Sequence, residues 1–165
     1  MNILSEFKKI NTFIFDVDGV LTNGDLIVNT DGNLLRTMNI KDGYAMQLAI
    51  KKGYNIIIIS GGKSELVRKR LEGLKITNNH FAVENKIAKL NELQLAYNLE
   101  LENCIYVGDD MPDVEAMKQV GLPCCPSDAC NQVKEIAKYI SPNIGGKGCA
   151  RDIIEKVLTL NGHWE

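Results

Sequence analysis

The chain has 165 residues, of which 45% are hydrophobic, which suits a single globular domain with a buried core. Its formal net charge of -2 gives no basic stripe and excludes nucleic acid as an expected partner. Residues 1–9 lack the apolar segment of a secretory signal, and the apolar run at residues 56–59 is too short to span a bilayer. We therefore expect one cytoplasmic domain over residues 1–165, with no membrane partner.

The cysteines do not form a metal-binding or disulfide pattern. There are five of them, at Cys104, Cys124, Cys125, Cys130 and Cys149. None belongs to a C-x-x-C pair, and neither histidine is close to them in the sequence, so zinc ligation is disfavoured. The odd count and the lack of an export signal favour reduced, buried thiols.

Predicted strands and helices alternate along the chain. Short runs rich in β-branched and aromatic residues predict strands at residues 12–15, 55–59, 81–83 and 105–107, with a weaker one at 139–141. Apolar residues at helical spacing predict helices at residues 43–52, 64–74, 86–97, 111–119, 129–137 and 150–160. This alternation indicates an α/β fold in three layers, with a central parallel sheet and helices on both faces.

The segment from Asp25 to Met38 interrupts this alternation. It holds two extended stretches separated by Thr30-Asp31-Gly32-Asn33, and Asp-Gly is a strong signal for a hairpin turn. A two-stranded ribbon buries little apolar surface by itself. We interpret this hairpin insertion, residues 25–38, as a small lid or an oligomerisation arm; an inert loop is the alternative.

Two acidic residues directly follow the first predicted strand. Asp16 and Asp18 are two positions apart, so on extended chain their side chains point the same way, and Gly19 then lets the backbone turn. Ligands bind at the carboxyl edge of such sheets. Two converging carboxylates repel each other unless a cation or a shared proton lies between them. A simple Asp-Gly turn is the alternative interpretation.

Polar residues also follow the other predicted strands. Ser60 and Gly61 come before a helix start, which suits phosphate binding and equally an ordinary helix cap. Lys86 opens a helix, where a lone lysine is usually a solvated charge. The strand at residues 105–107 is followed by the acids Asp109, Asp110 and Asp113. Clustered acids at a strand end destabilise the fold unless a hard cation accepts their oxygens.

The order of these motifs resembles the haloacid dehalogenase (HAD) superfamily of aspartate-nucleophile phosphohydrolases. D-x-D-G-V-L-T at residues 16–22 comes first, followed by Ser60, Lys86 and G-D-D-x-x-D at residues 108–113. The short length, the hairpin in place of a cap domain, residues 39–44 and a mobile-looking Gly-Gly-Lys-Gly loop are similar to the 3-deoxy-D-manno-octulosonate 8-phosphate (KDO 8-phosphate) phosphatases. The resemblance implies a Rossmann-like HAD fold.

The resemblance implies phosphomonoester hydrolysis through an aspartyl-phosphate intermediate, in the synthesis of lipopolysaccharide precursors. It makes Asp16 the nucleophile and Asp18 the general acid and base. Ser60 and Lys86 would hold the phosphoryl oxygens and stabilise the transition state.

A Mg²⁺ cofactor is implied in the same way. Its expected protein ligands are the carboxylates of Asp16 and Asp109 and the backbone carbonyl of Asp18. Asp110 and Asp113 would orient Lys86 and metal-bound water from a second layer. Mg²⁺ keeps several waters and few carboxylates, which suits this ligand set.

The implied substrate is a phosphorylated sugar acid. The residues expected to bind it are Asp18, Asn39, Ile40, Lys41, Asp42, Gly43, Gly61, Lys63, Arg70, Lys86 and Lys147. In the family the protein is a homotetramer, in which the hairpins and C-terminal tails, here residues 143–165, of neighbouring subunits help to close the site. Many members carry arginines that contact the sugar acid where this chain has Gly62 and Gln47; Lys63 and Arg70 would supply the missing charge.

Two other functions remain open from the sequence. A phosphatase for a nonulosonate 9-phosphate would share the length, fold and motifs, and would differ only in its cap and tail contacts. A receiver-like signalling domain also combines clustered acids, Mg²⁺, a hydroxyl and a lysine on an α/β sheet. A receiver has its adjacent acids early and its phospho-acceptor in mid-chain, whereas this chain has the reverse order.

Overall fold

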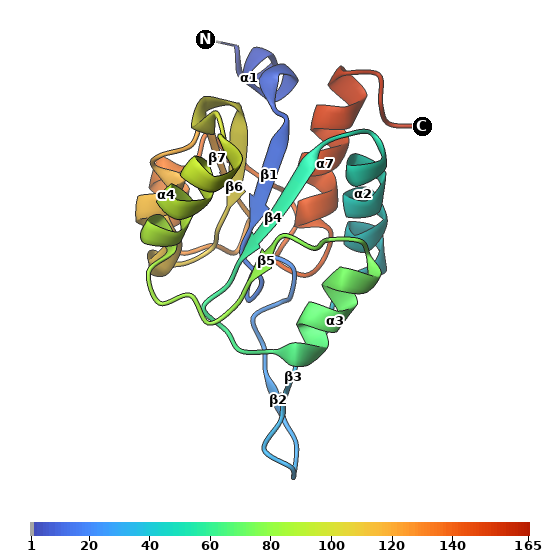
Figure 1. Ribbon diagram of the computed structural model, residues 1–165, viewed down its shortest axis with the longest axis vertical. Helices are drawn as coiled ribbons and strands as arrows, with labels where there is room; N and C mark the ends of the chain where they lie inside the picture. Colours follow the sequence, from blue (N-terminus) through green and yellow to red (C-terminus); the bar gives the residue numbers. More distant parts are fainter. Residues whose placement is uncertain (1) are drawn as a thin grey trace.

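One parallel sheet with helices on both faces forms the core of the protein. The computed structural model describes residues 2–165 (Figure 1). The strands of the sheet are β1 (Thr12–Phe15), β4 (Asn55–Ile59), β5 (Asn79–His80), β6 (Cys104–Val107), β7 (Leu122–Cys125) and β8 (Tyr139–Ile140). Their spatial order is β5-β4-β1-β6-β7-β8, and all neighbouring strands are parallel. The expected α/β fold with a central parallel sheet is confirmed.

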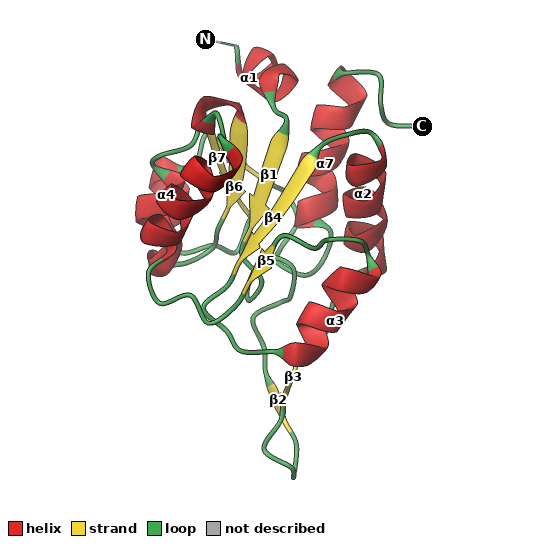
Figure 2. Ribbon diagram, viewed as in Figure 1, coloured by secondary structure: helices red, strands yellow, loops and turns green. Residues whose placement is uncertain are grey.

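The helices cover the sheet from two sides, as the red and yellow elements of Figure 2 show. They are α1 (Ile3–Lys9), α2 (Ile40–Lys51), α3 (Glu65–Gly73), α4 (Lys86–Tyr97), α5 (Val114–Met117), α6 (Asn131–Ile136) and α7 (Cys149–Leu160). Within residues 2–165, no helix combines the length and the apolar character that a membrane crossing requires.

The alternating side chains of the central strands divide the core into two parts. Phe13 and Phe15 of β1 pack with residues of α2, α3 and α7, whereas Ile14 packs with residues of α4, α5 and α6. Because both faces are covered, β1 is buried along its whole length. A strand buried on both faces has a continuous apolar sequence, which is why it could be predicted.

The register of the sheet aligns the ends of three strands. Phe15 at the end of β1 lies opposite Ile58 of β4 and Val107 of β6. Residues that follow these strands therefore emerge at the same edge of the sheet, although they are far apart in the sequence. Ligands bind at this edge in open α/β sheets.

Several elements differ from those predicted. The third strand, expected at residues 81–83, is β5 at Asn79–His80, and Ala82 has a φ of 56°, which is incompatible with a strand. The helix expected at residues 111–119 is a 3-10 turn at Met111–Asp113 followed by the short α5. The strand β7 was not predicted because Pro123 argues against a central strand.

The predicted hairpin is present and projects away from the sheet, at the lower end of Figure 1. Its strands are β2 (Ile27–Val28) and β3 (Leu34–Leu35), paired antiparallel. The side chains of Ile27, Val28 and Leu34 are 56%, 70% and 44% exposed. A ribbon this short, with apolar side chains in water, is marginal without a partner surface.

The glycine-rich loop before α7, expected from the sequence to be mobile, packs against its own chain. The N–H of Gly146 donates to the carbonyl oxygen of Val20 at 2.9 Å. A side-chain carbon at Gly145 would overlap the backbone oxygen of Gly19. The close approach of two backbones requires glycine here, so the loop supports the turn that follows β1.

Candidate active site

A cavity of about 420 Å³ opens at the carboxyl edge of the central strands. The predicted catalytic and metal-binding residues meet in its lining, which includes Asp16, Asp18, Ser60, Gly61, Gly62, Lys86, Asp109, Asp110 and Asp113. They follow β1, β4 and β6 or begin α4, so the aligned strand ends bring them together. One cavity thus holds hydroxyl, ammonium and carboxylate groups.

Lys86 links two carboxylates in this cavity. Its Nζ lies 2.8 Å from Asp16 Oδ2 and 2.7 Å from Asp113 Oδ1. The lysine is only 6% exposed. Burial by itself lowers the pKa of Lys86, but the charges of Asp16 and Asp113 outweigh burial and raise this pKa above its ordinary value. The ammonium therefore stays protonated, as a fixed positive charge facing Asp16.

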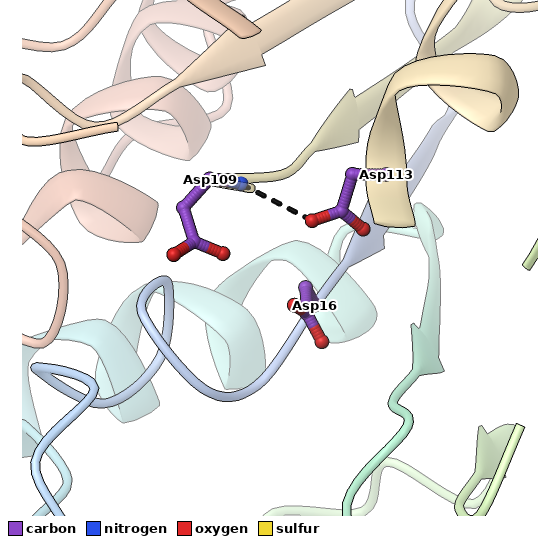
Figure 3. Close-up of side chains that lie close together, drawn as sticks. All are labelled: Asp16, Asp109 and Asp113. Carbon is purple, nitrogen blue, oxygen red and sulfur yellow. Dashed lines mark hydrogen bonds between the residues drawn. The ribbon is translucent and has the colours of Figure 1, made fainter. Parts of the chain in front are cut away.

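Asp113 is held in place from both sides of its carboxylate. Its Oδ1 accepts a hydrogen bond from the hydroxyl of Tyr106 at 3.0 Å in addition to the lysine. Its Oδ2 accepts one from the backbone N–H of Asp109 at 3.2 Å, the dashed line in Figure 3. Sequence reasoning missed Tyr106, because a tyrosine inside a buried strand is usually part of the core.

Three carboxylates approach one another in this cavity. Asp16, Asp109 and Asp113 each have an oxygen within 4.8 Å of the others (Figure 3). Burial, reinforced by the charge of Asp113, raises the pKa of Asp16 to about 7 against the opposing effect of Lys86. Burial and the charge of Asp16 raise the pKa of Asp109 to about 7. Without a cation, the protein resists ionising these two acids at neutral pH.

The acid cluster fits a hard cation. Among the described residues, Oδ1 of Asp109 is buried without a hydrogen-bond partner. Gly19 has a φ of 86°, and a side-chain carbon there would overlap Asp109, so glycine keeps the space beside this carboxylate open. Carboxylate oxygens at a partly open site suit Mg²⁺. Asp16 and Asp109 of the expected ligand set lie here, together with Asp113.

The carboxylate of Asp18 is engaged by a residue that sequence reasoning missed. Arg36, which directly follows β3, places Nε 2.6 Å from Asp18 Oδ1 and Nη2 3.0 Å from Oδ2. The hydroxyl of Thr22 lies 3.5 Å from the same Oδ1. Hydrogen bonding to Asp18 raises the pKa of Arg36 further above its ordinary value. No local motif identifies Arg36, because its partner lies in a different element.

Ser60 and Gly62 form the turn after β4. The hydroxyl oxygen of Ser60 accepts a hydrogen bond from the N–H of Gly62 at 3.2 Å, and the hydroxyl retains a proton that it can donate. A side-chain carbon at Gly62 would lie 3.0 Å from Asp18 Oδ2 and 3.2 Å from Arg36 Nη2. The absence of a side chain at Gly62 therefore makes room for the contact between Arg36 and Asp18.

Asp110 lies apart from the lysine that it was expected to orient. Its side chain accepts a hydrogen bond from the backbone N–H of Met111 at 2.8 Å and so caps the 3-10 turn that follows. Within residues 2–165, the ion pairs of Lys86 are made with Asp16 and Asp113. The lysine is therefore oriented by Asp113.

The residues expected to bind the sugar are divided among several places. Four of them line a separate cavity of about 1050 Å³ beside α2 and α7: Asn39, Ile40, Lys41 and Lys147. Arg70 and Arg36 both line a cavity of about 190 Å³ next to the hairpin, and Lys63 lines another of about 330 Å³. Within the described chain, only Asp18, Gly61 and Lys86 of the expected set line the acidic cavity.

Asp42 and Gly43 have structural surroundings. Asp42 is 1% exposed, and its Oδ1 accepts a hydrogen bond from the backbone N–H of Arg151 at 2.8 Å. This bond caps the beginning of α7, and burial raises the pKa of Asp42. A side-chain carbon at Gly43 would lie 3.0 Å from Nη2 of Arg70, so Gly43 allows α2 to approach α3.

The chain is similar to known proteins over nearly its whole length. The sequence profile of the haloacid dehalogenase-like hydrolases matches residues 82–153. The 3-deoxy-D-manno-octulosonate 8-phosphate phosphatase of Escherichia coli K12 is 32% identical over 161 residues, which cover 98% of this chain and 86% of that protein.

Solved structures show the same similarity. The phosphatase of that name from Moraxella catarrhalis, in complex with magnesium, phosphate and KDO, has a TM-score of 0.94 and 30% identity, covering 98% of this chain and 93% of that one. The cobalt-bound phosphatase from Haemophilus influenzae has a TM-score of 0.90 and 27% identity, covering 95% and 92%.

Proposed function

Because the chain belongs to the family of the 3-deoxy-D-manno-octulosonate 8-phosphate phosphatases, within the haloacid dehalogenase-like hydrolases, we propose that it hydrolyses KDO 8-phosphate to KDO and inorganic phosphate. The product is a precursor of lipopolysaccharide. The observation that carries this proposal is the acidic cavity, where Asp16, Lys86 and Asp113 are joined by two short ion pairs. This arrangement suits attack by a carboxylate on a bound phosphate.

Asp16 is the nucleophile in this proposal. Its Oδ1 accepts a hydrogen bond from the N–H of Val17 at 2.7 Å, and its Oδ2 faces Lys86, so the carboxylate has a fixed orientation. A carboxylate oxygen bonds to phosphorus while the bond to the sugar oxygen breaks. Asp18 gives a proton to that oxygen, then takes one from the water that hydrolyses the acyl phosphate and releases Asp16.

Lys86 and Ser60 bind the phosphoryl oxygens. The ammonium and the hydroxyl both line the cavity, and their positions are set before substrate arrives, by Asp113 and by the turn at Gly62. Donors that are already oriented stabilise charge that develops during the reaction. Mg²⁺, held by Asp16 and Asp109, supplies the positive charge that lets a carboxylate approach a phosphate dianion.

The active form in this proposal is a cytoplasmic homotetramer. The exposed apolar side chains of the hairpin support an assembly in which β2 and β3 pack against other copies. The dispersal of Lys41 and Lys147 away from the acidic cavity supports a site completed by a neighbouring subunit. The cysteines are all free thiols, which suits a reducing compartment.

Steady-state kinetics with Mg²⁺ test the substrate. We expect kcat/KM for KDO 8-phosphate to exceed that for a nonulosonate 9-phosphate by at least about tenfold, a difference of roughly 1.4 kcal/mol in transition-state binding. A higher kcat/KM for the nonulosonate 9-phosphate would assign the chain to the nine-carbon substrate. This alternative stays open because Gly62 stands where many family members carry an arginine that contacts the sugar acid. Equal and weak turnover of both would contradict any sugar-acid specificity. A p-nitrophenyl phosphate assay reports the chemistry separately from the sugar.

A further inference from the structure

The side chain of Arg36 connects the hairpin to Asp18, which lines the acidic cavity. The guanidinium contacts both oxygens of the Asp18 carboxylate, at 2.6 and 3.0 Å. Its Nη1 donates to the carbonyl oxygen of Leu34 at 3.0 Å, which fixes the guanidinium against β3. A two-point contact between a guanidinium and a carboxylate is directional as well as strong. The orientation of Asp18 is therefore tied to the position of the hairpin.

This contact conflicts with the first step of the proposed reaction. Asp18 must reach the departing sugar oxygen to give it a proton, whereas both oxygens of its carboxyl group are in contact with the guanidinium. A bidentate pair also blocks the approach of the sugar oxygen to the carboxyl group. The pair must therefore open when substrate binds, and the guanidinium then needs another anion.

The position of Arg36 indicates which anion this is. The phosphoryl group belongs beside Asp16, which follows β1, and Lys86, which begins α4. Arg36 lies beside Asp18, the expected proton donor to the leaving group, in the space that the missing side chain of Gly62 leaves open. A sugar acid carries a carboxylate on its leaving group, and a guanidinium binds carboxylates in the same two-point geometry.

We propose that Arg36 is a positioning and specificity residue, which holds Asp18 in the resting site and transfers to the carboxylate of the incoming sugar acid. The exchange replaces one guanidinium–carboxylate pair by another and frees Asp18 for proton transfer. It also explains how a chain with glycine at position 62 recognises an acidic sugar. This inference rests on the proposed function, since it needs an anionic leaving group.

The test is the variant Arg36→Ala, assayed on KDO 8-phosphate and on p-nitrophenyl phosphate. Hydrogen bonds to charged groups contribute about 1.5–3 kcal/mol, so we expect kcat/KM for the sugar acid to fall by roughly 10- to 100-fold. Turnover of p-nitrophenyl phosphate, which has no carboxylate to receive the guanidinium, should not fall, because the variant removes a pair that must otherwise open before Asp18 can act. Arg36→Lys should have a kcat/KM for the sugar acid between those of wild type and Arg36→Ala, because an ammonium keeps the charge but lacks the two-point geometry of a guanidinium.

Chemical rescue separates this role from a structural one. Millimolar guanidinium should restore part of the sugar-acid activity of Arg36→Ala, while sodium chloride at equal ionic strength should not. Arg68→Ala, which removes an arginine paired with Glu65 outside the cavity, is the matched control and should behave as wild type.

Two results would overturn the assignment of Arg36: equal losses on both substrates, or unchanged sugar-acid kinetics in Arg36→Ala. A wild-type protein that hydrolyses p-nitrophenyl phosphate but not KDO 8-phosphate would instead refute the proposed substrate. In that case, the exchange would be refuted as well if Arg36→Ala caused the same loss on a sugar phosphate that has no carboxylate.

Discussion

The floor of the acidic cavity and the hairpin beside it are built in opposite ways. On the floor, Lys86 and Asp113 are almost completely buried, and each side chain has at least two polar partners. In the hairpin, two-residue strands carry apolar side chains in water, and Arg36 provides the contact with Asp18. The residues expected to carry the chemistry are thus fixed within one chain, whereas in our proposal recognition of the sugar acid depends on the hairpin and on its packing against other copies.

Because of this difference, we expect substitutions in the two regions to affect different activities. Changes on the floor should affect every phosphate ester, because each substrate presents the same phosphoryl group there. Changes in the hairpin should affect the sugar acid and the assembly, and should spare small generic esters. The following predictions run from the largest expected effect to the smallest.

Asp16→Asn should abolish turnover of all esters. The change preserves shape but removes the nucleophile, and removal of such a group costs about 10⁴-fold or more in kcat. Lys86 keeps Asp113 as its partner, so the thermal unfolding temperature should stay close to that of wild type. Steady-state kinetics and circular dichroism measure the two effects. Turnover within tenfold of wild type would contradict the assignment of Asp16.

Lys86→Met should weaken both the fold and the reaction. It leaves two buried carboxylates without their cation, and breaking a buried pair in this way costs about 3 kcal/mol or more. Urea unfolding at neutral pH measures this loss. Lys118→Met is the matched control, because its pair with Glu115 is exposed and contributes less than about 1 kcal/mol. Equal effects from both variants would mean that burial of Lys86 has no energetic role.

The metal-free protein should lose stability as pH rises toward neutrality. The pKa values of Asp16 and Asp109 are both raised from 3.8 to about 7 in the folded protein. The unfolded chain therefore ionises these acids more readily, so the destabilisation is absent below pH 4, grows between about pH 4 and 7, and is complete above it. Raising each pKa from 3.8 to about 7 corresponds to roughly 4 kcal/mol per group, so we expect a loss of several kcal/mol over this range.

Urea titrations from pH 5 to 7.5, with EDTA or with Mg²⁺, measure this dependence. Mg²⁺ should stabilise the protein most at the upper end of the range, where the carboxylates are ionised and bind it best. Asp109→Asn should flatten the curve in EDTA and reduce the response to Mg²⁺. A metal-free protein whose stability rises with pH over this range would contradict the acid cluster.

Val28→Asp should weaken assembly and spare the floor. Val28 is 70% exposed in the hairpin, and a charge there would oppose burial against another copy. Sedimentation velocity should show smaller species, with p-nitrophenyl phosphate turnover within about threefold of wild type, since the cavity itself is unchanged. Leu95→Asp, at an 85% exposed position of α4, is the control. A monomeric wild-type protein with full sugar-acid activity would refute the tetramer.

Tyr106→Phe should have the smallest effect. It removes one hydrogen bond to Asp113 and leaves Lys86 in place, so we expect a loss of about 1 kcal/mol in stability. kcat should fall by about threefold to tenfold, equally for both substrates, because the lysine is held less firmly. Tyr97→Phe, at an exposed position, is the control. An unchanged kcat would show that Asp113 orients Lys86 without the tyrosine.

Local sequence patterns predicted much of the fold and most of the residues on the floor of the acidic cavity. The continuous apolar run of β1 indicated a buried strand, and the acids two residues apart indicated its active edge. The motif order predicted the haloacid dehalogenase family and a phosphatase, and both are confirmed by the relatives, which do not favour the receiver-like alternative. The association of Mg²⁺ with this family is also confirmed, by the magnesium complex from Moraxella catarrhalis.

The rest depended on contacts between distant parts of the chain. Arg36 and Asp18 are 18 residues apart and lie in different elements, so no periodic pattern links them. Tyr106 lies in a buried strand, where any large core residue would fit. Its hydroxyl acquires a role only through the hydrogen bond to Asp113, which the sequence does not indicate. The loop at Gly145 was expected to be mobile because glycine is common in flexible segments, whereas here it permits close packing on Gly19.

The close contact between positions 36 and 62 limits which substitutions each of them can accept. A side chain at position 62 would begin within 3.2 Å of the Arg36 guanidinium, so an arginine there would compete for the same space. Gly62→Arg alone should be harmful, yet it should be tolerated once Arg36 has become small. Since Arg36→Ala alone should also weaken sugar-acid turnover, we expect reciprocal sign epistasis, in which each single variant is less active than both the wild type and the double variant. Attempts to change the substrate preference of this enzyme should therefore vary positions 36 and 62 together.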